Sequence, residues 1–421
     1  MNVLDDLEWR GLIADSTDRD ALREALGSGS VKFYIGFDPT APSLHMGNLL
    51  QIVTAMRLQR AGHSPYMLVG GATGMIGDPR DSGERSLNSL DTVKEWVERV
   101  RRQIEPFVSF EGDNAATMVN NYDWTSGLST IDFLRDIGKH FPISRMLARE
   151  TVKRRLESAD GITYTEFSYV LLQSMDYLQL FRDHGVTLQF GGSDQWGNIT
   201  GGVELIRRAA GGHAHAFTTP LITKADGTKY GKTEGGALWL DPQMMSPYAF
   251  HQFWLNVEDA KVGELLRVFT FLSHGEIEEL EASTAEKPFL RAGQKALADH
   301  MTTLVHGAEE TEQAKAAAGA LFGGGDLTVL SPTTLASALQ EAGAVSIDKG
   351  EKWPSVVDLL VESGLATSRG EARRTIGEGG AYVNNIRVED AEAAVSEADL
   401  LGGSWLVLRR GKKRFAGVEI R

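Results

Sequence analysis

The chain has 421 residues, a length that suggests roughly two to four domains. Hydrophobic residues make up 42% and charged residues 24% of the chain, as in ordinary globular proteins, and the net charge of −14 argues against a non-specific nucleic-acid binder. The absence of cysteine excludes disulfides, thiolate nucleophiles, cysteine zinc sites and iron–sulfur clusters.

Residues 1–15 predict an amphipathic first helix. They are acidic and lack the basic start and apolar core of a secretory signal. No stretch of the chain approaches the ~18 consecutive apolar residues of a membrane span. We therefore expect a cytoplasmic protein that does not act at a membrane.

The first half of the chain predicts strands and helices joined by glycine-rich loops. Residues 31–36 and 65–69 are apolar runs typical of buried strands, and residues 48–60 between them have helical spacing. This order is that of a βαβ unit with parallel strands. A further strand at 187–190 precedes a helix at 199–209. Because an open α/β sheet binds its ligand at the carboxyl ends of its strands, we expect a site there.

Other stretches predict helices. Residues 91–108 carry apolar side chains at helical spacing, and residues 144–157 predict one strongly basic helix. Residues 244–320 alternate helical patterns with polar turns and predict an all-helical domain. The Ala- and Gly-rich run at 316–325 opens a segment typical of a linker.

The C-terminal residues predict a small mixed domain. Two helical patterns, at 355–364 and 368–379, precede three short strand patterns. The strands are expected at 381–385, 404–410 and 412–420.

The loop from Gly36 to Asn48 joins the first predicted strand to its helix. A helix N-terminus presents unpaired backbone N–H groups and the positive end of the helix dipole, which suit a phosphate. Gly47 would let a ligand approach the backbone, and Thr40 and His45 could donate to phosphate oxygens. The alternative is an ordinary turn with a helix cap at Asn48, and spacing alone does not decide between the two.

A second loop, Lys229-Tyr230-Gly231-Lys232-Thr233, places two lysines three residues apart beside a glycine. Such a loop can close on a polyphosphate and stabilise the charge that develops there. The alternative is a solvated surface loop, which charged loops usually form.

Tyr169, Gln173 and Asp176 carry polar groups of an otherwise apolar helix. Their spacing of i, i+4 and i+7 places all three on one helix face. A polar stripe on a buried face needs partners. A bound polar ligand or a satisfied internal network would supply them equally well.

Together these motifs resemble the class I aminoacyl-tRNA synthetases. His45-Met46-Gly47-Asn48 is similar to their HIGH motif, and the loop from Lys229 to Thr233 to their KMSKS motif. The surrounding segments resemble the bacterial tyrosyl-tRNA synthetases more narrowly, over nearly the whole chain. These segments are Tyr34-x-Gly-Phe-Asp-Pro-Thr-Ala, Tyr169-x-x-x-Gln-x-x-Asp and Gly191-Gly-Ser-Asp-Gln-Trp-Gly-Asn.

The resemblance implies an α/β protein with three domains. A Rossmann-like parallel-sheet catalytic domain would span residues 1–225, with a helical insertion at about 105–160. The KMSKS-type loop and an α-helical anticodon-side domain would span 226–320. After a linker at 321–352, a small α+β domain at 353–421 resembles the S4-like RNA-binding modules.

The resemblance also implies a role for each matching residue. Tyr34 and Asp176 would hold the tyrosine phenol, because an ionised carboxylate only accepts hydrogen bonds and so needs a donor. The α-amino pocket would consist of Asp78, Tyr169 and Gln173, with Gln195 near the carboxylate. The residues for ATP and the adenylate would be Gly36, Asp38, Gly47, Gly192, Asp194 and Lys232. The catalytic residues would be Thr40, His45, Asn48, Lys229, Lys232 and Thr233.

The implied reaction joins tyrosine to tRNA(Tyr) in two steps. The tyrosine carboxylate attacks the α-phosphate of ATP to give tyrosyl-AMP and pyrophosphate, and a ribose hydroxyl of the tRNA then attacks the adenylate. The carboxylate is already a nucleophile, so the first step needs positioning and charge stabilisation rather than a base. We expect Mg²⁺ to arrive with ATP and no tightly bound protein metal.

Basic residues predict tRNA contacts, and the resemblance implies a homodimer that the tRNA crosses. The residues expected to bind tRNA are Arg145, Arg149, Lys153, Arg154, Arg207, Arg208, Arg369, Arg373, Arg374, Arg409, Arg410 and Lys412.

Three positions depart from the family pattern. Asn48 replaces the last histidine of the HIGH motif but can still donate, and Ile35 replaces a cysteine that binds ribose in relatives. The loop at 80–85 has few basic residues for pyrophosphate, with Arg85 the expected substitute.

Three other functions remain open. A tryptophanyl enzyme is opposed by the pair Tyr34 and Asp176. An RNA-binding protein on an inactive synthetase body is opposed by the intact motifs, and an adenylate-forming enzyme without tRNA by the basic helix and C-terminal module.

Overall fold

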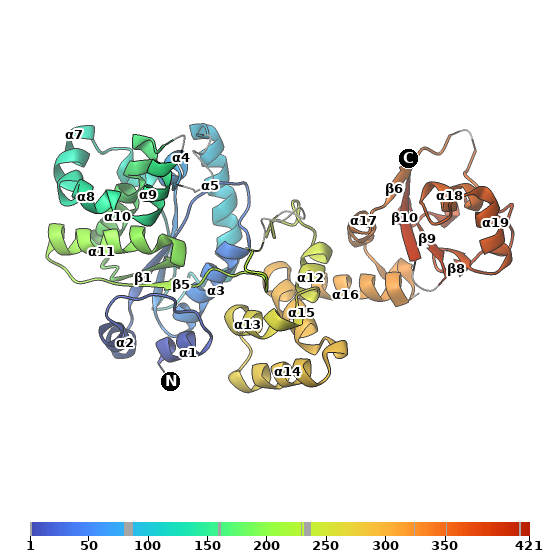
Figure 1. Ribbon diagram of the computed structural model, residues 1–421, viewed down its shortest axis with the longest axis horizontal. Helices are drawn as coiled ribbons and strands as arrows, with labels where there is room; N and C mark the ends of the chain where they lie inside the picture. The colour runs from blue at the N-terminus through green and yellow to red at the C-terminus, as the bar shows by residue number, and fades with distance from the viewer. Residues whose placement is uncertain are drawn as a thin grey trace. The chain divides into compact units, whose positions relative to one another are not determined.

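The computed structural model describes residues 2–79, 87–158, 161–228, 230, 237–323, 325–350, 352–411 and 414–421. The chain forms two compact units. Unit 1 consists of Met1–Asp241 and Gly263–Ile277, and unit 2 of Pro242–Val262 and Glu278–Arg421 (Figure 1). Of the helices in the described ranges, none combines the length and apolar character that crossing a bilayer requires.

Unit 1 is built on a parallel sheet of five strands. In the order β3-β2-β1-β4-β5 these are Thr117–Asn120, Ser64–Val69, Lys32–Phe37, Leu188–Gly192 and His215–Thr219. The predicted parallel α/β sheet is thus confirmed. All six residues of β2 are buried, as expected of a strand covered on both faces. Chain order reverses at β1, which has β2 on one side and β4 on the other, so the ligand crevice is expected there.

Helices connect and cover these strands. They are α1 Val3–Trp9, α2 Arg19–Ser28, α3 Met46–Arg60, α4 Thr73–Ile76, α5 Leu90–Ile104, α6 Tyr122–Thr125, α7 Thr130–Asp132, α8 Ile143–Leu147, α9 Glu150–Glu157, α10 Tyr164–His184 and α11 Trp196–Ala210. Short 3-10 or π turns lie at Glu105–Phe107, Phe133–Ile137, Gly138–His140 and Ser193–Gln195. The strand β3 lies within the stretch expected to be a helical insertion, and joins the sheet beside β2.

Two helix boundaries differ from those expected. Helix α3 begins at Met46, and its cap is His45 rather than Asn48: His45 Nδ1 accepts from the N–H of Gly47, and Asn48 Oδ1 accepts from the N–H of His45. Helix α5 ends at Ile104 rather than 108, because a 3-10 turn that contains Pro106 begins at Glu105.

The prediction of a single basic helix at 144–157 is wrong. The chain forms two helices, α8 and α9, and Arg149 between them has an extended backbone, with φ −68° and ψ 137°. An extended residue interrupts the helical hydrogen bonds. Arg149 is therefore the N-cap of α9 rather than part of a continuous basic face.

The next part of the chain is helical. Its helices are α12 Pro247–Leu255, α13 Asp259–Phe269, α14 His274–Glu286, α15 Ala292–His306, α16 Ala308–Gly323 and α17 Pro332–Glu341, with 3-10 turns at Pro288–Leu290 and Leu327–Val329. Two of these helices, α13 and α14, lie partly in unit 1, and the others belong to unit 2. The expected helical region is therefore present. Helix α17 packs with α16 through a core that includes Leu335, Leu339 and Leu321.

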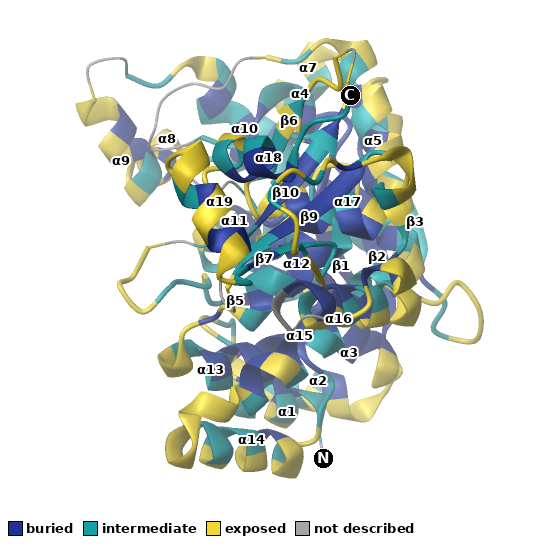
Figure 2. Cartoon of the chain, turned by 90° about the vertical axis from the view of Figure 1, so that its right-hand side faces the viewer, coloured by how far each residue is buried: buried dark blue, intermediate teal, exposed yellow. Residues whose placement is uncertain are grey.

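The C-terminal part of unit 2 is a mixed sheet with the order β6-β10-β9-β7-β8. Its elements are β6 Val345–Ile347, α18 Val356–Glu362, α19 Arg369–Gly377, β7 Ala381–Val383, β8 Ile386–Arg387, a 3-10 turn at Glu397–Asp399, β9 Trp405–Arg410 and β10 Arg414–Ile420. In Figure 2, β9 and β10 are mostly buried, whereas α19 has an exposed outer face. Part of the segment expected to be a linker, β6, pairs with β10.

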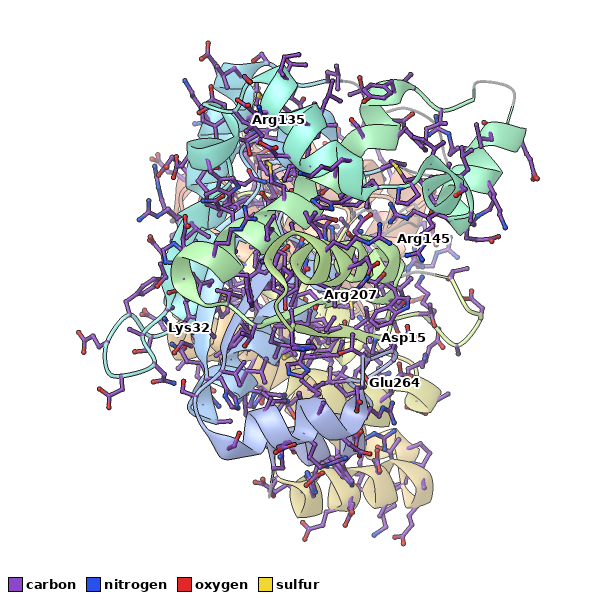
Figure 3. All side chains as sticks on the ribbon, turned by 90° about the vertical axis from the view of Figure 1, so that its left-hand side faces the viewer. Asp15, Lys32, Arg135, Arg145, Arg207 and Glu264 are labelled. Atoms are coloured by element: carbon purple, nitrogen blue, oxygen red, sulfur yellow. The ribbon has the colours of Figure 1, made fainter. Side chains whose placement is uncertain are left out.

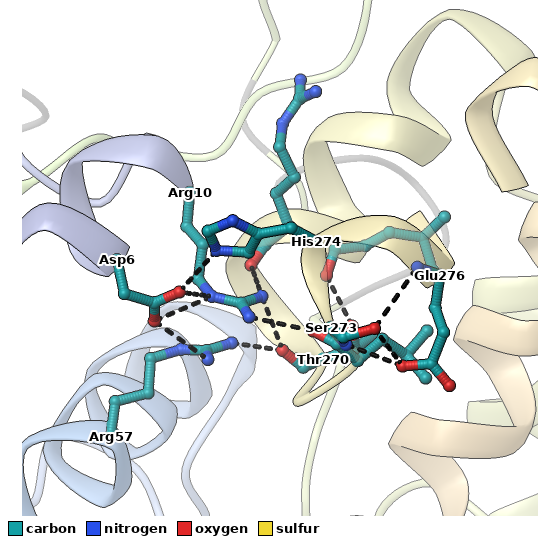
Figure 4. Close-up of polar contacts among 10 residues, drawn as sticks. Asp6, Arg10, Arg57, Thr270, Ser273, His274 and Glu276 are labelled. Atoms are coloured by element: carbon teal, nitrogen blue, oxygen red, sulfur yellow. Dashed lines mark hydrogen bonds and ion pairs between the residues drawn. The ribbon is translucent and has the colours of Figure 1, made fainter. Parts of the chain in front are cut away.

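A polar cluster joins α1 and α3 to residues 263–277 of unit 1 (Figure 4). Arg10 Nε donates to Asp6 at 3.0 Å, and His274 Nε2 lies 2.9 Å from the same carboxylate. Arg57 of α3 lies 3.8 Å from Asp6 and donates to the carbonyl oxygen of Thr270. Burial lowers the pKa of Arg57 to about 9, and the Asp6 carboxylate opposes that shift. The cluster anchors the C-terminal half of α3, the helix that His45 caps.

A buried ion pair gives a test of how α9 is held. Arg155 Nη1 and Glu166 Oε1 are 2.8 Å apart, with side chains 3% and 4% exposed. Removing one partner leaves the other charge buried, so we expect Arg155→Met to lower the free energy of unfolding by about 3–5 kcal/mol. Urea unfolding followed by circular dichroism measures this. The exposed pair of Arg99 and Glu95 gives the control, because Arg99→Met should cost less than about 1 kcal/mol. Equal losses in the two variants would contradict the argument.

Candidate active site

Asp38 lies directly after β1 and is held from two sides. Thr73 Oγ1, after β2, donates to Asp38 Oδ1 at 2.6 Å, and the Tyr169 hydroxyl of α10 donates to Asp38 Oδ2 at 2.5 Å. The close approach depends on Gly70, because a Cβ there would lie 2.0 Å from Asp38 Oδ1. Desolvation and the Asp38 charge raise the pKa of Tyr169 well above its usual range, so this phenol keeps its proton.

Asp176 is a buried carboxylate on α10, with 2% of its surface exposed. Trp124 Nε1 donates to its Oδ1 at 2.9 Å, and Asn121 Nδ2 donates to its Oδ2 at 3.0 Å. Burial raises the pKa of Asp176 to about 7, although both hydrogen bonds favour the ionised form. Asn121 also donates to Thr73 Oγ1 at 2.9 Å, so one polar network runs from Tyr169 to Trp124.

Tyr34 and Gln173 lie beside this network. Tyr34, on β1, is 1% exposed, and its hydroxyl donates to the backbone carbonyl of Gln173 at 3.4 Å. Burial raises the pKa of Tyr34 well above its usual range. Among the described residues, Gln173 Oε1 is buried without a hydrogen-bond partner. Such an acceptor costs free energy unless a ligand donates to it.

A second polar group surrounds Asp78. Gln195 Nε2 donates to Asp78 Oδ2 at 2.8 Å, and Asn198 Nδ2 donates to Asp78 Oδ1 at 3.1 Å. Asn198 also donates to Gln195 Oε1 at 2.9 Å, which closes a triangle of side chains. Desolvation raises the pKa of Asp78, and the Gln195 and Asn198 hydrogen bonds oppose the shift.

The residues expected to contact ATP lie on loops at the same edge of the sheet. Gly36 is in β1, and Thr40, His45 and Gly47 lie between β1 and the first turn of α3, all three exposed. Gly192 ends β4, and the exposed Asp194 follows it. Strands β1 and β4 are hydrogen-bonded neighbours, so both loops leave the sheet at one edge. Lys229, Lys232, Thr233 and Arg85 lie outside the described residues.

The basic residues expected to bind tRNA in unit 1 differ in their contacts and exposure. Arg145, Arg207 and Arg208 converge on Glu204, at 3.4, 2.8 and 2.6 Å. Arg145 and Arg207, labelled in Figure 3, have side chains 69% and 61% exposed. The hydrogen bond from Arg207 is the largest of the influences that lower the pKa of Glu204 to about 2. Lys153 and Arg154 are exposed on α9, whereas Arg149 turns inward to donate to Asn198 Oδ1.

Several basic residues of the C-terminal sheet domain are paired within it. Arg369 lies 2.6 Å from Asp358, Arg373 3.4 Å from Glu392, and Arg410 2.8 Å from Glu371. Arg409 donates to the backbone carbonyl of Leu321, and Arg374 is exposed on α19. Lys412 lies outside the described residues.

Sequence reasoning missed four residues of the polar network. Thr73 follows β2, and Asn121 and Trp124 follow β3. Asn198 lies in the first turn of α11. The strand β3 was not recognised, so nothing placed Asn121 or Trp124 at the edge of the sheet. Asn198 is the last residue of the family-like motif Gly191-Gly-Ser-Asp-Gln-Trp-Gly-Asn. Its place in that motif could have marked it as a site residue.

Comparisons with known proteins show the family to which the chain belongs. The family model described as tRNA synthetases class I (W and Y) matches residues 27–323, and the model described as the tyrosine–tRNA ligase SYY-like C-terminal domain matches residues 335–418. A tyrosine–tRNA ligase of Streptomyces coelicolor is 60% identical over 420 residues, 100% of this chain and 99% of the relative. One of Corynebacterium glutamicum is 56% identical over 421 residues and covers 100% of both chains.

A solved structure is also similar. The crystal structure of a C-terminally truncated mitochondrial tyrosyl-tRNA synthetase of Aspergillus nidulans matches with a TM-score of 0.69 and 31% identity, over 75% of this chain and 92% of that chain. The chain therefore belongs to the class I tRNA synthetases, in the group that contains the tryptophan and tyrosine enzymes. Within that group it belongs to the tyrosine–tRNA ligase family and has tyrosine–tRNA ligase activity.

The raised pKa of Asp176 makes stability depend on pH. Between about pH 4 and 7 the folded chain keeps a proton on Asp176 that the unfolded chain has released, so this contribution to stability is complete below pH 4 and is lost as pH rises through 7. We expect the free energy of unfolding of the native chain, relative to Asp176→Asn, to fall by up to about 4 kcal/mol between pH 4 and 8. Urea unfolding at several pH values measures this.

The control for that experiment is Asp113→Asn, which removes an exposed carboxylate of the same unit. The difference in the free energy of unfolding between the native chain and Asp113→Asn should change much less between pH 4 and 8. A difference between the native chain and Asp176→Asn that stayed constant from pH 4 to 8 would contradict the raised pKa.

Proposed function

We propose that the chain activates L-tyrosine with ATP and transfers it to the 3′ end of tRNA(Tyr), with Asp176 selecting the substrate. The observation that carries the proposal is this carboxylate, buried at 2% exposure on the same face of α10 as Tyr169 and Gln173. A buried acceptor favours a substrate that brings a donor, as a phenol does. Phenylalanine brings no such donor, so the capacity of the Asp176 carboxylate that Trp124 and Asn121 leave unused would stay unused.

The remaining polar groups account for the rest of the amino acid. Asp78, the Tyr169 hydroxyl and the unpartnered Gln173 Oε1 are acceptors suited to an ammonium group, and Gln195 is placed beside Asp78 to meet the carboxylate. Tyr34 would complete the contact with the phenol, because its hydroxyl reaches α10 and donates to the backbone carbonyl of Gln173 at 3.4 Å.

ATP would bind on the loops of the neighbouring strands. Gly36, Asp38, Gly47, Gly192 and Asp194 are the proposed contacts with nucleotide and adenylate. The loop before α3 supplies Thr40, the start of α3 supplies His45 and Asn48, and a helix N-terminus suits phosphate. Lys229, Lys232 and Thr233 would stabilise the pyrophosphate as it leaves. The attacking oxygen belongs to the tyrosine carboxylate, and the P–O bond to pyrophosphate breaks.

We propose that Mg²⁺ enters with the phosphates of ATP. In the part of the chain that the structure describes, the His, Asp and Glu side chains form no group of three or more that could hold a metal ion. Mg²⁺ commonly keeps waters and binds through substrate phosphates, which agrees with this proposal. Because the substrate tRNA serves translation, we place the reaction in the cytoplasm.

The tRNA would contact both units. In unit 1 we propose the Arg145, Arg207 and Arg208 group around Glu204, together with Lys153 and Arg154, because three guanidinium groups around one carboxylate leave excess positive charge. In unit 2 we propose an S4-like domain over 353–421. Its candidate contacts are Arg369, Arg373, Arg374, Arg409, Arg410 and Lys412, although ion pairs within the domain engage three of them.

Activation can be tested without tRNA. We expect ATP–pyrophosphate exchange with tyrosine and not with tryptophan or phenylalanine. Asp176→Ala should lower kcat/KM for tyrosine by about 10- to 100-fold, because it removes a charged hydrogen-bond acceptor. Asp113→Ala, at an exposed position, is the control and should leave exchange unchanged. A folded chain that binds tRNA but exchanges with none of the three amino acids would contradict the enzyme and support an RNA-binding protein.

We also propose a homodimer formed through α8 and α9. Ile143, Leu147 and Leu156 on these helices are 59%, 40% and 50% exposed. Apolar side chains exposed on adjacent short helices are typical of interaction surfaces.

The double variant Ile143→Glu and Leu156→Glu should convert a dimer to a monomer, because burying two unpaired carboxylates is unfavourable. Sedimentation velocity measures the mass. Phe110→Glu, at an exposed apolar residue outside these helices, is the control and should remain dimeric. A native chain that sediments as a monomer at micromolar concentration would contradict the proposal.

A further inference from the structure

Arg149 lies against the amino-acid site rather than on the outer face of the basic helices. We infer that Arg149 is a positioning residue for this site: it sets the direction of the Asn198 amide, and through Asn198 the orientation of Asp78 and Gln195. The inference rests on the proposed function, because it concerns how the groups that would bind the tyrosine ammonium and carboxylate are held.

The contacts form a short chain that ends at the proposed substrate groups. Arg149 Nη2 donates to Asn198 Oδ1, and Asn198 Nδ2 donates to Asp78 Oδ1 at 3.1 Å and to Gln195 Oε1 at 2.9 Å. Gln195 Nε2 donates to Asp78 Oδ2 at 2.8 Å. Asn198 is 3% exposed, so water cannot readily replace a lost partner.

The guanidinium group of Arg149 determines which atom donates and which accepts in this series of hydrogen bonds. A guanidinium group only donates, so the Asn198 atom that faces Arg149 must be its oxygen. The amide nitrogen then faces Asp78 and the oxygen of Gln195, which leaves the nitrogen of Gln195 to face Asp78. The Asp78 carboxylate only accepts and favours the same orientation of the Asn198 amide, so Arg149 adds a second constraint on that amide from its opposite side.

The backbone around Arg149 allows its guanidinium to approach Asn198 closely. Its guanidinium passes over Gly197 so closely that a Cβ there would lie 2.7 Å from Nη2. The extended backbone between α8 and α9 turns the side chain inward, and its surface is only partly exposed. Desolvation lowers the pKa of Arg149 and the Asp78 charge raises it, so the two groups interact. Exposed neighbours such as Lys153 lack such a contact with Asn198.

The test separates tyrosine activation from tRNA binding. Arg149→Met keeps the length of the side chain but removes its donors, and we expect the KM for tyrosine in ATP–pyrophosphate exchange without tRNA to rise about tenfold, with kcat changed less than about twofold. Equilibrium dialysis should show the same weakening of tyrosine binding. Arg149→Lys, which still only donates, should restore most of the loss.

A double-mutant cycle tests whether Arg149 acts through Asn198. In the Asn198→Ala background, Arg149→Met should have little further effect on the KM for tyrosine, because the amide it orients is gone. Arg102→Met removes an exposed arginine of α5 and is the control for charge, with no expected effect on exchange.

Two outcomes would overturn the inference. In the first, exchange by Arg149→Met is unchanged and only the KM for tRNA rises, which would make Arg149 a tRNA contact. In the second, Arg149→Met and Arg149→Lys lose kcat equally and both unfold at lower urea concentration, which would make its role structural. Failure of the proposed function is distinguishable, because the native chain itself would then neither bind tyrosine nor support exchange.

Discussion

The desolvated carboxylates at one edge of the parallel sheet are the constraint on which the site depends. Asp78 and Asp176 are each held by two side-chain donors, because an unpaired carboxylate removed from water costs several kcal/mol. The partly buried Asp38 also accepts hydrogen bonds from two side chains, those of Thr73 and Tyr169. These donors compensate only in part, since the pKa values of Asp78 and Asp176 remain raised. The site is therefore completed by a ligand that brings donors of its own.

The fold supplies these donors from places far apart in the sequence. Strand β3 delivers Asn121 and Trp124 to Asp176, and the start of α11 delivers Gln195 and Asn198 to Asp78. The cluster around Asp6 holds the other end of α3 within the same unit. The positions of these polar groups thus depend on packing elsewhere in unit 1, and a change outside the site can alter the geometry of the site.

The proposed tRNA contacts rest on local groups of arginine in a chain that is acidic overall. Arginines gather around Glu204 in unit 1, where they outnumber the carboxylate. In unit 2, Arg369, Arg373 and Arg410 pair with acidic side chains at close range. A paired arginine can still meet a phosphate through its remaining donors. Binding there would depend on geometry more than on net charge, which agrees with the net charge of −14.

The parallel sheet, the family and the polar face of α10 could be predicted from the sequence, because they depend on local periodicity and short motifs. The sequence did not reveal β3, the break between α8 and α9, or the cap at His45, since short or exposed elements are decided by their neighbours. Only the tertiary structure brought Asn121, Trp124 and Asn198 to the carboxylates and turned Arg149 from an expected tRNA contact toward Asn198. The physical reason is that a hydrogen bond across more than forty residues leaves no periodic signal in the sequence.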